Sequence, residues 1–209
     1  MPGLHIPGLP DDISGPVRAD YRYPAGLTET QVRDSAPLRG YSGKGLLTDS
    51  SGMERPIHIK PHHFVDIITA YGGGVETFRP HPYGHALHAV AERILTQPDL
   101  LLELVLGADD ICAPCVHNID GICDDTIDTS YRPTAPPAKH EWNLLIDRRW
   151  CRRLGLEPGR RISARELCRL LARDAQDLCD IYPEIPTERT AERARKLQAG
   201  IRRFLDQGQ

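Results

Sequence analysis

Residues 56–74 read PIHIKPHHFVDIITAYGGG, and the first clear signals of regular structure in the chain lie here. Residues 57–59 alternate between apolar and polar side chains, as in a short strand. Pro61 is favoured in the first turn of a helix, and the three glycines that close the stretch stop that helix. We therefore expect a strand at residues 57–59 and a helix over residues 61–71.

The chain beyond this stretch shows mostly helical periodicity. Its sharpest local signal is the pair Ser163 and Glu166, whose spacing is that of a capping box. We expect, in chain order, a helix from Pro82 to near Pro98, a short buried strand within residues 101–107, a helix over residues 139–154, a helix from Ser163 through Cys179 to Pro183, and a final amphipathic helix capped by Thr187. The expected fold class is mainly α, an α+β domain with a minimal two-stranded sheet.

The N-terminal quarter of the chain has a different texture. Residues 1–55 contain eight glycines and six prolines and show no sustained helix or strand period. Such a segment cannot bury enough apolar surface for a core of its own, so we expect an extended arm that binds a protein partner or a second copy of the chain. Residues 56–182 are then the cysteine-rich metal or cluster domain, and residues 183–209 a C-terminal helix packed on it.

Composition and charge exclude several classes of protein. Hydrophobic residues make up 40% of the chain and the formal net charge is −3, which fits a globular domain without a global field for nucleic acid. Nine arginines lie in residues 148–173 and six aspartates in residues 109–128, and we expect two solvated faces that pair with each other. No aromatic platform accompanies the arginines, so nucleic acid is not an expected partner. With no apolar run long enough for a bilayer and no signal peptide, we expect a cytoplasmic protein without a membrane segment.

The cysteines carry the clearest chemical signal. Cys112 and Cys115 form a CxxC pair, and Cys123 follows eight residues later beyond a glycine-containing loop. Thiolates at this spacing can bind one metal ion or corners of a cluster. A thioredoxin-type redox pair is less suitable, because Pro114 lies inside the motif and no βαβ unit precedes it. The surrounding carboxylates, without Lys or Arg in the same segment, favour a bound cation that offsets their repulsion.

The fourth ligand has several candidates. Cys179 is the best cysteine, because Cys151 and Cys168 fit core positions. The other candidates are His62, His63, Asp66 and His117. Adjacent helix positions point about 100° apart, so one of the two paired histidines at most should face the site.

Three further histidines, His81, His85 and His88, lie at i, i+4 and i+7 in the expected second helix. They fit a separate metal or acid–base patch, or a solvated polar face, and we favour the polar face because the pattern lacks the glutamate of an HExxH motif.

Several motifs together resemble a known family, the cysteine-rich prokaryotic domain of unknown function number 1284. The matching pieces are Lys60-Pro61-His62-His63-Phe64, the glycines at 72–74, residues 107–115 (GADDICAPC), Cys123, and residues 154–159 (LGLEPG) ahead of the helix that leads to Cys179. The resemblance covers residues 56–182 and implies a cysteine-based metal fold without naming a reaction. Members of the family commonly have a cysteine where this chain has Asp66, and a second CxxC pair whose last position here is Tyr182. The site then uses Cys179 as its fourth ligand, or has three cysteines with Asp, His or an open position.

Our leading hypothesis is an iron–sulfur protein, an enzyme or biosynthetic accessory subunit acting on a small molecule. A 4Fe–4S cluster is expected on Cys112, Cys115, Cys123 and Cys179, with Asp66 as a further metal ligand. His62, His63 and Asp110 are the expected catalytic residues, with His63 or Asp110 transferring protons. The alternative is a structural zinc module that binds a protein partner. A nucleic-acid accessory protein that uses the arginines is a weaker third hypothesis.

Overall fold

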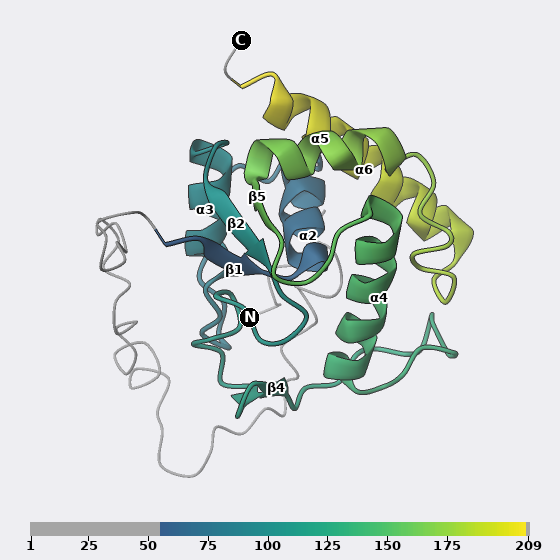
Figure 1. The fold of residues 1–209 in the computed structure, drawn as a ribbon. Helices are drawn as coiled ribbons and strands as arrows, with labels where there is room; N and C mark the ends of the chain where they lie inside the picture. Colours follow the sequence, from purple (N-terminus) through teal and green to yellow (C-terminus); the bar gives the residue numbers. More distant parts are fainter. Residues whose placement is uncertain (1–54, 208–209) are drawn as a thin grey trace, which may run out of the picture.

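A computed structural model describes residues 55–207, which form five helices and two small sheets, with β4 at the edge of the fold (Figure 1). The mainly helical α+β class predicted from the sequence is therefore confirmed. The predicted N-terminal arm, apart from Arg55, lies outside the described residues.

The main sheet has three strands, one more than the sequence predicted. The strands are β1 (Ile57–Ile59), β2 (Leu101–Leu104) and β5 (Arg161–Ser163), in the order β1-β2-β5. β1 runs parallel to β2, with Ile57 beside Leu102, and β5 runs antiparallel to β2. β5 escaped prediction because Ile162 is its only apolar residue and the capping box follows at once.

The helices enclose the central helix α2. Their bounds are α2 Pro61–Gly72, α3 Leu87–Thr96, α4 Lys139–Leu154, α5 Ala164–Asp174 and α6 Thr187–Leu205. Ten of the twelve residues of α2 are buried. α6 packs along α2 where Gly72 faces Gly200, and a Cβ at either position would run into the backbone of the other helix. No helix of residues 55–207 combines the length and apolar character needed to cross a membrane.

Two helix predictions need correction. The helix expected from Pro82 begins at Leu87, because residues 81–86 form a turn in which Gly84 has a φ of 72°. The helix expected to reach Pro183 ends at Asp174, beyond which the Asp177 side chain accepts a hydrogen bond from the Cys179 backbone N–H in a local turn. Cys179 is therefore not helical.

Of the two helix N-termini predicted from capping residues, one has the expected cap and the other does not. Ser163 and Glu166 form the predicted capping box, with both reciprocal hydrogen bonds present. Thr187, expected to cap α6, is instead its first residue, and Pro186 stands at the N-cap position without a side-chain hydrogen bond. Cys151 and Cys168 are buried in the core, as predicted.

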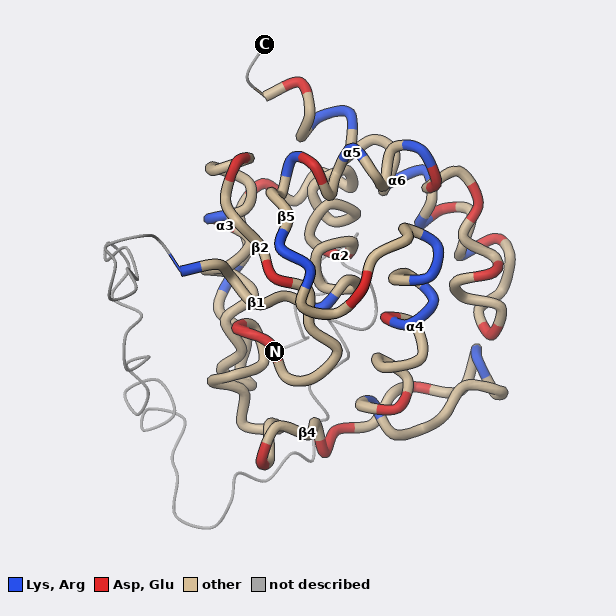
Figure 2. Tube along the Cα trace, in the orientation of Figure 1, with Lys and Arg blue, Asp and Glu red and all other residues tan. Residues whose placement is uncertain are grey.

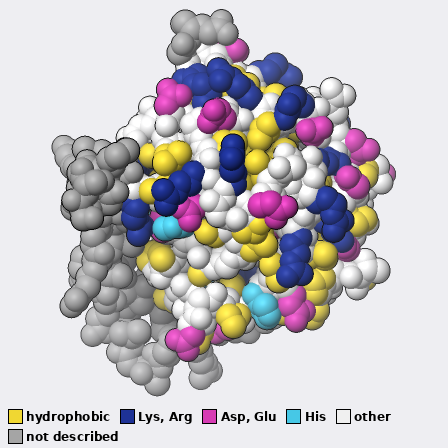
Figure 3. Space-filling view, in the orientation of Figure 1, with side chains coloured by type: hydrophobic (Ala, Val, Ile, Leu, Met, Phe, Trp, Pro, Cys, Tyr) yellow, Lys and Arg dark blue, Asp and Glu magenta, His cyan; other side chains and the backbone are white. Residues whose placement is uncertain are grey.

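Charged side chains of both signs are interspersed over the folded surface. Figure 2 shows acidic residues near β4 and also elsewhere on the fold, with many of the basic residues on α4, α5 and α6, and the face in Figure 3 carries both signs close together. The expected pairing between residues 109–128 and the arginine segment is not what the structure shows. Ion pairs of that segment join Arg149 to Glu184, Arg161 to Glu103 and Arg165 to Asp99.

Candidate metal centre

The cysteine loop is more regular than the sequence suggested. Residues predicted to be irregular form a small hairpin, β3 (Asn118–Ile119) and β4 (Ile122–Cys123). Its two turn residues, Asp120 and Gly121, both have positive φ, at 50° and 87°, as a type I′ turn requires. The hairpin pairs Cys123 with Asn118 and so brings the third cysteine back towards the CxxC pair.

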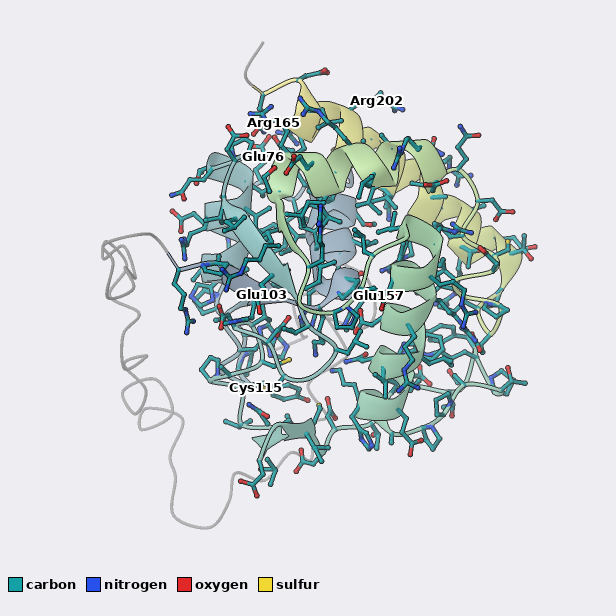
Figure 4. All side chains as sticks on the ribbon, in the orientation of Figure 1. Glu76, Glu103, Cys115, Glu157, Arg165 and Arg202 are labelled. Atoms are coloured by element: carbon teal, nitrogen blue, oxygen red, sulfur yellow. The ribbon has the colours of Figure 1, made fainter. Side chains whose placement is uncertain are left out.

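The three loop cysteines line one cavity of about 180 Å³. Figure 4 labels Cys115, which lies in the loop between the main sheet and β4. The remaining walls come from the start of α2, the segment after β2, the hairpin and the first turns of α4: Lys60, Leu106, Gly107, Ala108, Asn118, Gly121, Ile122, His140, Asn143 and Leu144. The structure thus brings together three of the four predicted cysteine ligands.

A buried carboxylate, Asp109, holds the entrance of the loop against the start of α2. One of its oxygens accepts hydrogen bonds from the backbone N–H of Lys60 at 2.9 Å and from the ring of His63 at 2.7 Å. The other accepts from the backbone N–H of Cys112 at 2.9 Å. Burial raises the pKa of Asp109, but His63 and then Lys60 outweigh it and hold the pKa well below its usual range. Asp109 is therefore an ionised anchor, and the Lys60 ammonium sustains it when His63 is neutral.

A lysine ammonium contacts the first cysteine of the motif. Lys60 is 5% exposed, and its Nζ lies 3.1 Å from Cys112 Sγ. Burial lowers the pKa of Lys60, but the nearby Asp109 and Cys112 outweigh burial and raise this pKa above its ordinary value. Burial and the nearby Asp109 raise the pKa of the Cys112 thiol to about 12, so a metal that binds this sulfur must displace its proton. Residues 109–128 contain no Lys or Arg of their own, but in the folded protein Lys60 places a cation beside Cys112.

His63 completes a compact group of donors with Asp109 and Cys112. One ligand atom from each lies within 4.8 Å of the others, and this is the one such group of three among residues 55–207. Burial lowers the pKa of His63 to about 3, so the ring is neutral and donates its Nδ1–H to Asp109.

The side chains of His62 and His63 point to different parts of the fold, as their adjacent helix positions predict. His62 points to α4, where Asp147 bonds both its backbone N–H and its ring Nδ1 at 2.8 Å. Both side chains are almost fully buried. His62 therefore ties α2 to α4, while His63 faces the cysteine loop.

The other predicted site residues lie elsewhere. Asp110 accepts from the backbone N–H of His58 at 3.0 Å and pairs with Arg55 at 3.3 Å. Asp66, buried on α2, pairs with Arg193 of α6. Cys179 lies between α5 and α6, where its sulfur is 3.6 Å from the Thr190 hydroxyl, and it does not line the cavity.

The remaining histidines do not form the expected three-residue helix face, because only His88 is helical. The rings of His81 and His85 still stack, 4.4 Å apart, across the turn before α3. Burial lowers the pKa of His81 to about 4 and that of His85 to about 3. His117 bonds Asp124 at 2.8 Å, which places it in the support of the hairpin.

Sequence reasoning gave no site role to four polar residues of the cavity wall, Lys60, Asn118, His140 and Asn143. Lys60 had an available signal, its position between the first strand and the paired histidines. His140 and Asn143 share a face of α4 with the buried Asp147, and only the placement of α4 shows that this face borders the cysteines.

Comparison of the chain with protein-family models, with curated proteins and with solved structures finds no match. The resemblance to the domain of unknown function rests on its motifs and stays a prediction.

Proposed function

We propose that this protein binds an iron–sulfur cluster through Cys112, Cys115 and Cys123. The observation that carries the proposal is that all three line a single cavity of about 180 Å³. A 4Fe–4S cluster accepts one thiolate on each of several irons, so its protein ligands surround a space rather than a point.

The spacing of the sulfurs favours a cluster over a single ion at the three cysteines. Bonds of about 2.3 Å to one tetrahedral zinc place its ligand sulfurs about 3.8 Å apart. The three sulfurs do not form a group within 4.8 Å, since the one such group among residues 55–207 contains a single cysteine. A single ion would require these three sulfurs to lie closer together, whereas the sulfur ligands of a cluster stand further apart, each on its own iron.

The charges around the cavity support the same site. An ammonium 3.1 Å from Cys112 Sγ repels a metal cation but stabilises an anionic assembly. A cluster core with three thiolates carries a net negative charge, and hydrogen bonds to its sulfurs are a usual feature of such sites. Lys60 supplies both the charge and the donor.

A second candidate function is a mononuclear zinc site at His63, Asp109 and Cys112, favoured by their mutual distances. The hydrogen bonds that Asp109 already accepts weigh against this zinc site. Its oxygens already accept hydrogen bonds from two backbone N–H groups and from His63, and the Lys60 ammonium is adjacent.

Metal analysis of anaerobically purified full-length protein separates the two sites. We expect about four iron and four sulfide per chain with broad visible absorption, lost in Cys115→Ala and in Cys123→Ala. His63→Ala and Cys179→Ser are the matched controls and should keep the cluster. One zinc per chain that survives Cys115→Ala and Cys123→Ala but is lost in His63→Ala would instead establish the mononuclear site.

A further inference from the structure

The wall of the cavity that α4 forms contains one more metal-binding side chain. His140, Asn143 and Leu144 all line the cavity, as residues at i, i+3 and i+4 of one helix face do. Of the thirteen lining residues, only the three cysteines and His140 have side chains that ordinarily bind iron or zinc.

We propose that His140 is the fourth protein ligand of the cluster, an inference that rests on the proposed function. Three thiolates leave one iron of a 4Fe–4S cluster without a protein ligand. The three cysteines come from residues 112–123, whereas His140 reaches the same cavity from α4. It therefore supplies the ligand that the loop lacks.

The surroundings of His140 leave its ring available. Its side chain is 45% exposed, and its Nε2 lies 4.0 Å from Glu141 Oε1, longer than a hydrogen bond. Cys179, the ligand favoured by the sequence, is instead held between α5 and α6 beside Thr190. His140 thus combines a place in the cavity wall with a ring that no side-chain hydrogen bond within residues 55–207 holds elsewhere.

The charge of the site also favours an imidazole over a fourth thiolate. Six aspartates lie in residues 109–128, and Lys60 is the cation in contact with a ligand sulfur. A neutral imidazole completes the coordination without another negative charge. Replacement of thiolate by histidine also raises the reduction potential of iron–sulfur centres.

The test compares the wild type with His140→Ala, His140→Cys and the neighbouring control Glu141→Ala, all as full-length protein purified without oxygen. In the wild type, pulsed EPR of the reduced cluster should show strong ¹⁴N coupling, absent from both His140 variants and retained in Glu141→Ala. His140→Ala should convert to a 3Fe–4S form on mild oxidation, and added imidazole should restore the ¹⁴N coupling. His140→Cys should keep four irons and have a lower reduction potential.

Each result that contradicts the proposal leads to a different conclusion. A wild-type protein without iron and sulfide overturns the proposed function and this inference with it. A wild-type cluster without strong ¹⁴N coupling, unchanged in His140→Ala, overturns the ligand assignment alone. Loss of the fourth iron in Cys179→Ser, with His140→Ala unaffected, also overturns it in favour of the cysteine. Thermal melting checks that each variant is folded.

Discussion

Replacing Gly200 with alanine should destabilise the protein, although alanine is the better helix former. Gly200 lies in α6 where this helix crosses α2, and a Cβ there would be 2.9 Å from the carbonyl carbon of Ile68 and 3.0 Å from the backbone nitrogen of Gly72. It would lie closer still to the carbonyl oxygen of Ile68. These are backbone atoms of a central helix, so no side chain can rotate away to relieve the overlap.

The expected magnitude follows from two opposing effects. Alanine gains about 1 kcal/mol over glycine in a helix interior. Overpacking of a well-packed core costs about 1–3 kcal/mol, and a clash between two helix backbones belongs at the upper end. The net loss should be about 2 kcal/mol, which lowers the melting temperature by roughly 4–8 °C for a domain of this size.

Urea unfolding of wild type, Gly200→Ala and Gly107→Ala measures this directly. Gly107 is the matched control, because a Cβ at that position meets nothing within 4 Å. Its unfolding free energy should change by no more than about 0.5 kcal/mol. If Gly200→Ala were as stable as the wild type or more so, the close approach of α2 and α6 would be refuted.

Three other predictions concern charge. The His85 pKa is about 3 in the folded protein and about 6.5 when unfolded, so its contribution to stability is present above pH 6.5 and is lost as the pH falls; the loss at pH 5 is about 2 kcal/mol. Urea unfolding at pH 7 and pH 5 should show that His85→Gln makes the loss of stability smaller by about 2 kcal/mol, while His63 and His81, whose pKa values burial also lowers, keep their own contributions to the loss. An unchanged loss would contradict the assignment. Lys60→Met should lower the reduction potential of the proposed cluster, measured by redox titration, because an ammonium beside Cys112 stabilises the reduced, more negative state. An unchanged or higher potential would contradict that role. Arg149→Met should lower the free energy of unfolding by about 1–3 kcal/mol, because Arg149 donates two hydrogen bonds to Glu184 and one to the Ile181 carbonyl. A decrease below about 0.5 kcal/mol in chemical unfolding would show that this ion pair does not stabilise the fold.

Local signals in the sequence predicted most of the helices. The helices at 61–72 and 139–154 and the capping box of α5 follow from residues close in sequence, and the structure has them at or near the expected bounds. Errors arose where a tertiary contact or a turn decides the outcome. β5 is a strand because β2 offers it a partner, and the hairpin was missed although Asp120-Gly121 is a recognised I′ turn pair.

The residues of the candidate site show the same contrast between local signals, which the sequence reveals, and tertiary placement, which it does not. Three cysteines of one short loop share a cavity, as their spacing predicted, because the hairpin folds within the loop itself. Cys179 does not line that cavity, because α5 ends at Asp174 and the chain turns towards α6. His140 comes from a distant segment, and a single sequence carries no spacing rule that joins it to the loop. Lys60 is also distant in sequence, and its only signal was its position between the first strand and the paired histidines.

The burial of Asp109 explains how contacts between protein atoms shape the cavity. Its hydrogen bonds to Lys60, His63 and Cys112 join the start of α2 to the loop through protein atoms. The hairpin closes the rest of the loop with its own backbone pairing. The carboxylate anchor and the hairpin therefore hold the walls of the cavity in place through contacts between protein atoms.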